Sequence, residues 1–324
     1  MLFNSTKLLL TNTMMIGVIM TICSNNWISM WMGLEISLLS FIPFMQTDNQ
    51  ISSESMIKYF IMQSAASTMM LLSVVTMLIG GSMFDEIIMT VAMLIKIGSV
   101  PFHNWVIMII ESLSYYTIFT LLTILKLPPL SILYQTSSQM LNFPIMLSMI
   151  VSSVSCLNQS SVRKTLGYSS IYNMAMIMLV INSYCIMMTY LILYSITMIM
   201  LINMTKKLKI NFINQMLVNE HNMNIKINLW LNMLSMGGFP PLIGFIGKLL
   251  VIQMMILNNE VLLMVIVMLT SMLVIMFYMR MAFTSLMSIS LSKKWMTNKT
   301  NSSYFIMLTN LTLPPLMISL SMIA

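Results

Sequence analysis

The sequence predicts an all-α, polytopic membrane protein with about eleven transmembrane helices. Of its 324 residues, 58% are hydrophobic and only 7% are charged, and the mean hydropathy is +0.91. A soluble domain carries about 25% charged residues, so this chain cannot cover a water-facing surface with them and its solvent must be lipid. A span takes roughly 20 apolar residues, which leaves room for ten to twelve spans.

Hydrophobic runs and the breaks between them place the helices along the chain. The connections are short, and the longest polar stretch, Lys206 to Lys226, is expected to be a loop and not a domain. Residues 1–324 are therefore expected to form a single membrane domain. The eleven spans are predicted at 3–23, 27–45, 56–80, 85–109, 113–135, 140–160, 164–182, 184–205, 226–257, 261–288 and 303–322.

The basic residues of the loops predict the orientation. With eleven spans, the N-terminus and every even-numbered loop lie on one side of the membrane, and all the loop Lys and Arg residues fall there. The opposite loops carry only Asp85, Glu86 and Glu260. Since basic loops stay inside, we expect an inside N-terminus and an outside C-terminus. The basic set is Lys7, Lys58, Arg163, Lys164, Lys206, Lys207, Lys209, Lys226, Lys293, Lys294 and Lys299.

Composition also argues against several other classes of protein. The cysteines Cys23, Cys156 and Cys185 are widely separated, which argues against a zinc site, an iron–sulfur site or a disulfide framework. A net charge of +7 would suit nucleic-acid binding only on a solvated domain, and none is predicted. The 44 methionines suit the codon usage of an AT-rich animal mitochondrial genome better than they suit a metal site, because they occur throughout the chain.

Five charged side chains fall inside predicted spans: Glu35, Lys96, Lys126, Lys248 and Arg280. A charged residue at the centre of a span costs about 2.5–3.5 kcal/mol on insertion scales, so the lysines and the glutamate together would cost on the order of 10 kcal/mol if unpaired. Arg280 lies in the inner half of its helix and can extend to the basic face. Glu35 is the one deep carboxylate, and it cannot neutralise three lysines.

Two interpretations of the three lysines remain open, a structural role in ion pairs or at span ends and a proton relay. Burial and neighbouring positive charges both favour the uncharged amine, so at least one lysine is expected to exchange protons near neutral pH. The relay is the stronger prediction. His103, just after Pro101, is either a proton carrier or, more simply, a hydrogen-bonded residue at a helix end.

Helix-breaking residues interrupt two of the predicted spans. The segment from Lys96 through Gly98 to Pro101 interrupts the fourth span, and 237–241, Gly-Gly-Phe-Pro-Pro, interrupts the ninth. Broken backbone at membrane depth is tolerated where it is buried in protein or lines a water-filled cavity. Breaks at corresponding positions in two halves indicate an inverted-repeat transporter. We therefore predict inverted five-helix repeats at 3–135 and 140–288, discontinuous fourth and ninth helices, and a terminal helix at 303–322.

At these residues the chain resembles a known family, the antiporter-like membrane subunits of respiratory complex I (NADH:ubiquinone oxidoreductase), and in particular its mitochondrially encoded members. The segments that carry the resemblance follow one another in the family's order and extend almost to Arg280. Each is weak alone, but together they are highly specific. They are Trp31-Met32-Gly33-Leu34-Glu35-Ile36, Lys58-Tyr59-Phe60, Lys96-Ile97-Gly98, Pro101-Phe102-His103, Leu157-Asn158-Gln159, Arg163-Lys164, Tyr168-Ser169-Ser170, the run 234–241, Gly244-Phe245 and Lys248.

The resemblance implies a role for each deep charge. Glu35 matches the family's channel glutamate, and Lys96 matches its partner lysine on the first broken helix. Lys126 matches the central connecting lysine, and Lys248 the lysine on the second broken helix. In that family pattern Glu35 modulates the protonation of Lys96, and protons pass along the three lysines through bound water. Quinone reduction elsewhere in the complex drives the changes in charge.

The resemblance also implies the setting of the chain. No cofactor or metal is expected on it, whereas NADH, FMN, iron–sulfur clusters and ubiquinone belong to other subunits of the assembly. The expected partners are other membrane-arm subunits and membrane lipids such as cardiolipin, with no nucleic acid. The expected location is the mitochondrial inner membrane, with the N-terminus on the matrix side and the C-terminus on the intermembrane-space side.

The chain departs from the family pattern at several positions. Ile124 and Leu125 replace a Trp-Gln pair before the central lysine, Gly247 and Leu249 flank the last lysine in place of Pro and Trp, and Asn173 replaces a histidine in the seventh span. Two alternative functions remain open, a freestanding cation/proton antiporter and a structural membrane subunit that conducts nothing. A structural subunit should tolerate the loss of the three lysines.

Overall fold

The computed structural model describes residues 5–47, 49–80, 83–136, 139–218, 223–287, 309–312 and 315. Within these ranges the chain is almost entirely helical, and the β-structure in them is one isolated bridge between Ser161 and Phe212. The chain divides into two compact units, Met1–Ser148 and Met149–Ala324. The boundary falls inside α8 (Asn142–Leu157), which follows the short 3-10 helix η2 (Gln139–Leu141).

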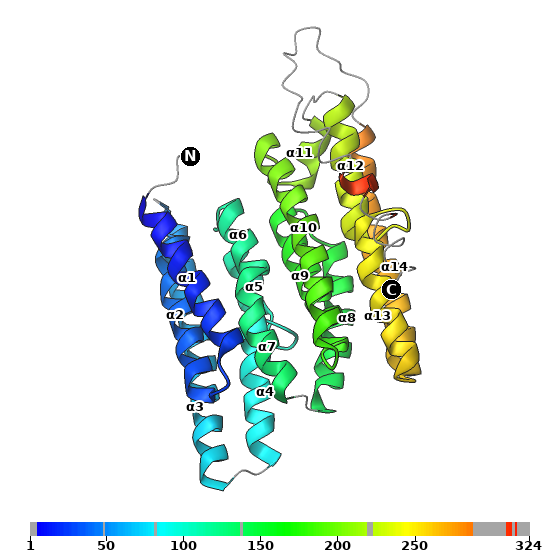
Figure 1. The fold of residues 1–324 in the computed structure, drawn as a ribbon. Coiled ribbons are helices and arrows are strands. Elements are labelled where there is room, and N and C mark those ends of the chain that lie inside the picture. Colours follow the sequence, from blue (N-terminus) through cyan, green and yellow to red (C-terminus); the bar gives the residue numbers. More distant parts are fainter. Residues whose placement is uncertain are drawn as a thin grey trace. The chain divides into compact units, whose positions relative to one another are not determined.

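The first unit is a bundle of helices that pack side by side (Figure 1). It contains α1 (Ser5–Cys23), α2 (Trp27–Met45), α3 (Gln50–Gly80), α4 (Met83–Ile97) and α5 (Asn104–Ile110). It continues with α6 (Tyr115–Leu122), a 3-10 turn η1 (Ile124–Lys126) and α7 (Leu127–Thr136). Helices α1 and α2 pack closely because Gly17 and Gly33 lie at the contact. A Cβ atom on Gly17 would lie 2.8 Å from the carbonyl oxygen of Gly33.

The second unit contains the remaining helices. They are α9 (Val162–Leu179), α10 (Tyr184–Leu208), α11 (Ile213–Val218), α12 (Met223–Gly237), α13 (Ile243–Leu257) and α14 (Val261–Met287). Helix α12 packs on α10, α13 and α14. Backbone hydrogen bonds from Val162 to Asn211 and from Ile213 to Ser160 attach the segment after α10 to the start of α9.

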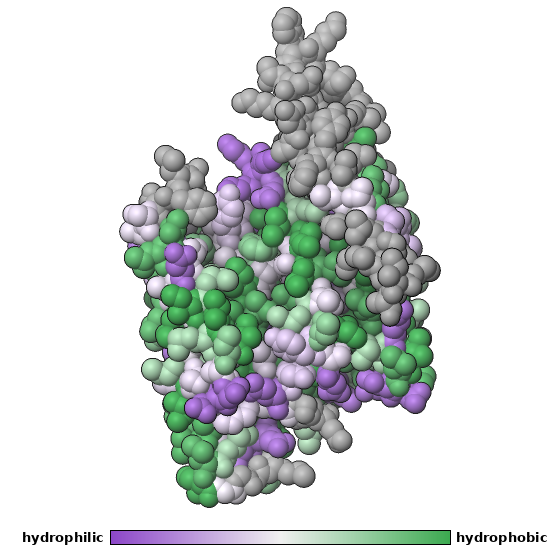
Figure 2. Space-filling view, viewed as in Figure 1, coloured by the Kyte–Doolittle hydropathy of each residue, from purple (hydrophilic) through white to green (hydrophobic). Residues whose placement is uncertain are grey.

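Large apolar side chains on the outside of both units support lipid as the solvent. Ile79 on α3 is 81% exposed and Met276 on α14 is 67% exposed, and Figure 2 shows hydrophobic side chains over much of the visible face. Six helices in the described residues are long and apolar enough to cross a membrane. The prediction of an all-α, polytopic membrane protein is confirmed. The inverted repeats stay a prediction.

The described helices follow the first ten predicted spans, with three of them interrupted. The predicted spans 85–109 and 226–257 are each two helices, separated at the predicted breaks. The predicted span 113–135 is interrupted at η1 as well, because Pro128 and Pro129 have no N–H to donate to the carbonyl oxygens of residues 124 and 125. The eleventh predicted span lies outside the described residues, apart from 309–312 and 315.

The stretch from Lys206 to Lys226 differs from the predicted loop. Lys206 and Lys207 occupy the last turn of α10, where positive charge is favourable. Helix α12 begins at Met223, before the predicted span that starts at Lys226, and Lys226 is only 8% exposed. The loop prediction failed at both ends, and it also missed the short helix α11, because polar composition reports little about where helices begin and end.

Candidate functional site

The break after α4 is a glycine-terminated helix end. Gly98 has φ +71°, and the amide of Ser99 donates to the carbonyl oxygen of Leu94 at 3.1 Å. This is the Schellman arrangement, in which the residue after the last helical one takes a left-handed conformation that suits glycine. It leaves the carbonyl of Ile97, the last residue of α4, pointing away from the helix without a helical partner. Lys96 therefore lies in the last turn of α4, one residue before a carbonyl that has no partner within its own helix.

Lys126 supplies the partner for that carbonyl. Its Nζ donates to the carbonyl oxygen of Ile97 and lies 5.1 Å from the centre of the Trp105 ring. The indole Nε1 of Trp105 donates in turn to the carbonyl oxygen of Ile95, at 3.1 Å. Lys126 is 3% exposed, so its ammonium is stabilised by a helix C-terminus and an aromatic face in place of water.

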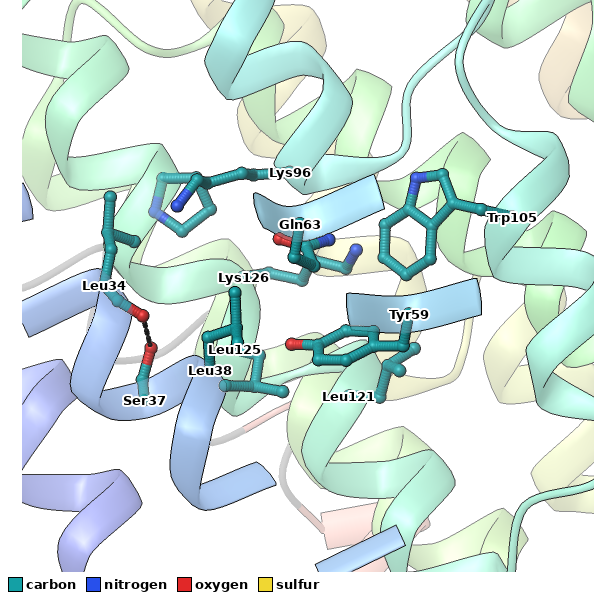
Figure 3. Close-up of a pocket in the computed structure, with 11 residues that line it drawn as sticks. Leu34, Ser37, Leu38, Tyr59, Gln63, Lys96, Trp105, Leu121, Leu125 and Lys126 are labelled. Carbon is teal, nitrogen blue, oxygen red and sulfur yellow. Dashed lines mark hydrogen bonds between the residues drawn. The ribbon is translucent and has the colours of Figure 1, made fainter. Parts of the chain in front are cut away.

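A small cavity brings Lys96 and Lys126 together (Figure 3). Its volume is about 20 Å³, on the measure by which one water needs roughly 10–15 Å³. Tyr59 and Gln63, one turn apart on α3, also line it, as does Trp105. Figure 3 shows the two lysines entering this space from different elements, α4 and η1. The cavity can hold a water between polar groups of three parts of the chain.

Glu35 lies beside this cavity on α2. Its neighbours Leu34 and Ser37 line the cavity, and its carboxylate interacts electrostatically with Lys96 and Tyr59. No direct ion pair joins the described side chains of Glu35 and Lys96. The Oε1 atom of Glu35 is buried and has no hydrogen-bond partner among the described residues. A buried carboxylate oxygen of this kind is a position where water binds.

The break between α12 and α13 repeats the first arrangement in the second unit. Gly238 has φ +77°, and the amide of Phe239 donates to the carbonyl oxygen of Leu234 at 3.2 Å. Lys248, on α13, donates from Nζ to the carbonyl oxygen of Gly237, the last residue of α12. The lysine lies 5.9 Å from the centre of the Tyr172 ring and is 6% exposed.

Lys248 also faces a cavity of about 20 Å³. Its polar lining comes from three helices, with Asn173 on α9, Tyr190, Tyr194 and Thr197 on α10, and Ser235 on α12. The hydroxyl of Tyr190 donates to Oδ1 of Asn173 at 3.0 Å, and Nδ2 of Asn173 donates to the carbonyl oxygen of Ser169. Asn173 is thus part of the environment of Lys248.

Comparison with known proteins decides the family. Residues 24–274 match the model of the family described as NADH:quinone oxidoreductase/Mrp antiporter, TM. NADH-ubiquinone oxidoreductase chain 2 of Anopheles gambiae is 34% identical over 293 residues, which cover 86% of this chain and 86% of that protein. The chain belongs to the NADH-ubiquinone oxidoreductase chain 2 family.

Two solved structures contain a chain with the same fold as this one. A chain of respiratory complex I from Thermus thermophilus superposes with a TM-score of 0.82 at 17% identity, covering 96% of this chain and 78% of that one. A chain of the Mrp complex from a Dietzia species superposes with a TM-score of 0.74 at 14% identity, covering 90% of this chain and 62% of that one.

The charged residues predicted for the site lie in two groups. Glu35, Lys96 and Lys126 gather in the first unit and Lys248 lies in the second. Arg280 is exposed and its guanidinium donates to the carbonyl oxygen of Leu157 at 3.0 Å. His103 directly precedes α5 at its N-cap position.

Several residues of the two cavities were missed from the sequence. Tyr59 was named only as part of a family segment, with no role at the site. Gln63 escaped notice because uncharged polar residues are common in this chain, although its spacing of four from Tyr59 places both on one face of α3. Trp105 reads as an ordinary apolar residue of a span. Tyr190 and Tyr194 have the same spacing of four on α10 and line the second cavity.

Proposed function

We propose that this chain translocates protons as a membrane-arm subunit of NADH-ubiquinone oxidoreductase, with Glu35, Lys96, Lys126 and Lys248 as the relay. One observation carries the proposal. Two buried lysine ammoniums, those of Lys126 and Lys248, each bind the terminal carbonyl of a broken helix and each face a cavity that can hold water. Membership of the chain 2 family supports it.

The geometry allows a lysine to gain and lose a proton without leaving its place. The helix C-terminus stabilises the charged amine, and burial away from water favours the neutral one. An ammonium that donates one N–H to a carbonyl has two others, which can pass a proton to water in the adjoining cavity. Proton transfer needs steps of about 2.6–3.2 Å, or one water between groups. Each cavity thus supports exchange at its lysine.

Glu35 acts in this proposal as the group that sets the charge of Lys96. A carboxylate near a buried ammonium favours the charged form, and the two interact electrostatically with no direct ion pair. Water at the buried Oε1 of Glu35 would link the carboxylate to its surroundings. A change in the charge of Glu35 therefore alters the readiness of Lys96 to release its proton.

Redox chemistry takes place elsewhere in this account. NADH, FMN, the iron–sulfur clusters and ubiquinone are assigned to other subunits, and their reactions provide the energy. Other membrane-arm subunits and lipids such as cardiolipin surround the chain in the mitochondrial inner membrane. The N-terminus lies in the matrix, so protease cleavage after Lys209 is expected only from the matrix side. Cleavage from the other side would reverse the orientation.

The experiment that tests the proposal compares Lys248→Met with Arg280→Met in the assembled complex. Sealed vesicles report protons moved per electron passed from NADH to ubiquinone. Lys248→Met should lower this ratio while assembly continues. Arg280→Met should leave the ratio unchanged in the complex that assembles and act on its stability, because Arg280 is exposed and, within the described residues, bonds to a backbone carbonyl. An unchanged ratio in Lys248→Met would favour the non-conducting subunit.

A further inference from the structure

A line of buried polar side chains runs along α12 toward Lys248. Asn228, Asn232 and Ser235 are each 1% exposed. Spacings of four and three residues place them on one face of the helix. At 1.5 Å per residue the line is about 10 Å long, and its inner end, Ser235, lines the cavity of Lys248. Apolar residues would be the default for buried helix positions in a membrane, so three neutral polar ones in a row need an explanation.

Helix α10 presents a matching face to α12. Thr197 lines the Lys248 cavity with Ser235, and Thr205 lies about two turns further along α10; both are buried, at 3% and 0% exposed. The end of α10 and the start of α12 are also adjacent, since Leu208 and Ile225 line one small cavity. The two helices are therefore antiparallel, and both polar lines advance from Lys248 toward the same end of the unit.

The middle of the line contains unpaired polar atoms. On α10 the apolar Leu201 lies between Thr197 and Thr205, so the polar groups at this level come from Asn232 and Asn310. Nδ2 of Asn310 donates to Oδ1 of Asn232. The other two amide atoms, Nδ2 of Asn232 and Oδ1 of Asn310, are buried and have no partner in the described part of the chain. Turning both amides around would still leave one donor and one acceptor.

Bound water would give both atoms a partner. A buried donor or acceptor without a partner is costly, and buried waters are commonly found at such groups. The hydroxyls of Ser235, Thr197 and Thr205 each donate to a backbone carbonyl of their own helix, which leaves oxygen lone pairs able to accept from water. None of the five side chains of the line (Thr197, Thr205, Asn228, Asn232 and Ser235) carries a charge. Such a lining can hold a chain of bound water, over which a proton can pass in steps of hydrogen-bond length.

We propose that the line formed by Thr197, Thr205, Asn228, Asn232 and Ser235 is a hydrated proton route between Lys248 and the face at which α10 ends. It deepens the proposed function, because it rests on proton exchange at Lys248 and names the path by which that lysine reaches one surface. The net step is simple: a proton enters the water line at one end, and the neutral amine of Lys248 accepts a proton at the other, or the reverse.

The first test measures access of water-soluble reagent along the line. In an assembled complex in which the three cysteines of this chain are replaced by serine, Asn232→Cys is compared with Met233→Cys. Met233 is the next residue of α12, equally buried at 1% exposed, and points to a different face. A small, charged thiol reagent should modify Cys at 232 about tenfold faster than at 233, since a thiolate forms only where water reaches it. Equal, slow modification at both positions would show a dry interior and overturn the proposal.

The second test measures pumping and separates this inference from the proposed function. Asn232→Leu removes the polar group at the middle of the line, and Met233→Leu is its matched control. Protons moved per electron should fall in Asn232→Leu and Lys248→Met but not in Met233→Leu. A normal ratio in Asn232→Leu with a lowered ratio in Lys248→Met would refute the route and leave the relay intact. Normal ratios in both would refute the relay as well.

Discussion

Lys248 donates from Nζ to the carbonyl oxygen of Gly237, the last helical residue before the break between α12 and α13. In the first unit, Lys126 makes the same bond to Ile97, the last residue of α4. Both carbonyls come directly before a glycine with positive φ in a Schellman helix end. The two lysines therefore bind equivalent carbonyls. They differ in position, because Lys248 lies on α13, directly after the helix end that it binds, whereas Lys126 lies on η1, beyond α5 and α6.

The close approach of Lys248 to Gly238 predicts that Gly238→Ala strongly impairs pumping. An added Cβ would lie 2.6 Å from Cε and 2.7 Å from Nζ of Lys248, and a left-handed backbone costs a non-glycine residue about 1–2 kcal/mol. The lysine should leave the Gly237 carbonyl, and protons moved per electron should fall.

Gly80→Ala is the matched control for that variant. Gly80 also has positive φ, +149°, but a Cβ there meets nothing within 4 Å. It should lower the yield of assembled complex without changing the proton ratio. Equal ratios in the two variants would show that contact with Lys248 is immaterial to pumping.

Trp105 is predicted to hold Lys126 and the end of α4 together. Trp105→Leu removes a desolvated cation–π contact worth up to about 2 kcal/mol and the hydrogen bond to Ile95. Pumping should fall while the complex assembles. Trp105→Phe keeps an aromatic face, so it should retain more of the proton ratio than Trp105→Leu does. Identical proton-to-electron ratios in the two variants would show that the aromatic contact does not contribute to pumping.

Glu35→Gln is predicted to impair pumping with little effect on assembly. The variant keeps size and hydrogen-bonding capacity but removes the negative charge that favours the protonated form of Lys96. Glu35→Asp keeps the charge and should retain part of the activity. The measurement is the initial rate of acidification during NADH oxidation in sealed vesicles. Full activity of Glu35→Gln, with normal assembly, would assign Glu35 a purely structural position.

Close packing of α1 on α2 predicts a defect of assembly in Gly17→Val. The Cβ would meet the backbone at 2.8 Å, at the carbonyl of Gly33 and the amide of Ser37, and overpacking of this kind costs about 1–3 kcal/mol. The assembled complex should decrease on native gels, with normal proton ratios in what remains. Thr13→Val, on the same helix, is the control, because Thr13 is only part-buried and its hydroxyl bonds within α1; a loss of assembly equal to that of Gly17→Val would argue against the glycine contact.

The sequence predicted the helical membrane fold and the places where helices break. Hydropathy marked the spans, and Gly98 and Gly238 marked the breaks, because only glycine readily accepts their backbone conformation. The charged residues of the site were predicted because charge is costly in lipid. Pairing within the site could not be predicted. Nothing in the sequence indicates that Lys126 binds Ile97, because the bond joins residues 29 positions apart through a backbone carbonyl that every residue has.

The uncharged part of the site was also beyond the sequence. Serine, threonine and asparagine are frequent throughout this chain, so Asn232 or Thr205 does not stand out until burial is known. Asn173 was noted only as a substitution, and its hydrogen bond to Tyr190 beside Lys248 emerges from the packing of α9 on α10. The polar stretch before Lys226 was misread as a loop because composition reports little about short helices.

The central claim is that the buried lysines carry the transported protons. Its most direct test is the number of protons moved per electron in Lys126→Met, measured in sealed vesicles containing the assembled complex. Methionine preserves the length and packing of the side chain but cannot hold a proton, so the account predicts a lowered ratio with NADH still oxidised. An undiminished ratio in Lys126→Met, with normal assembly, would contradict the account and place the proton path elsewhere.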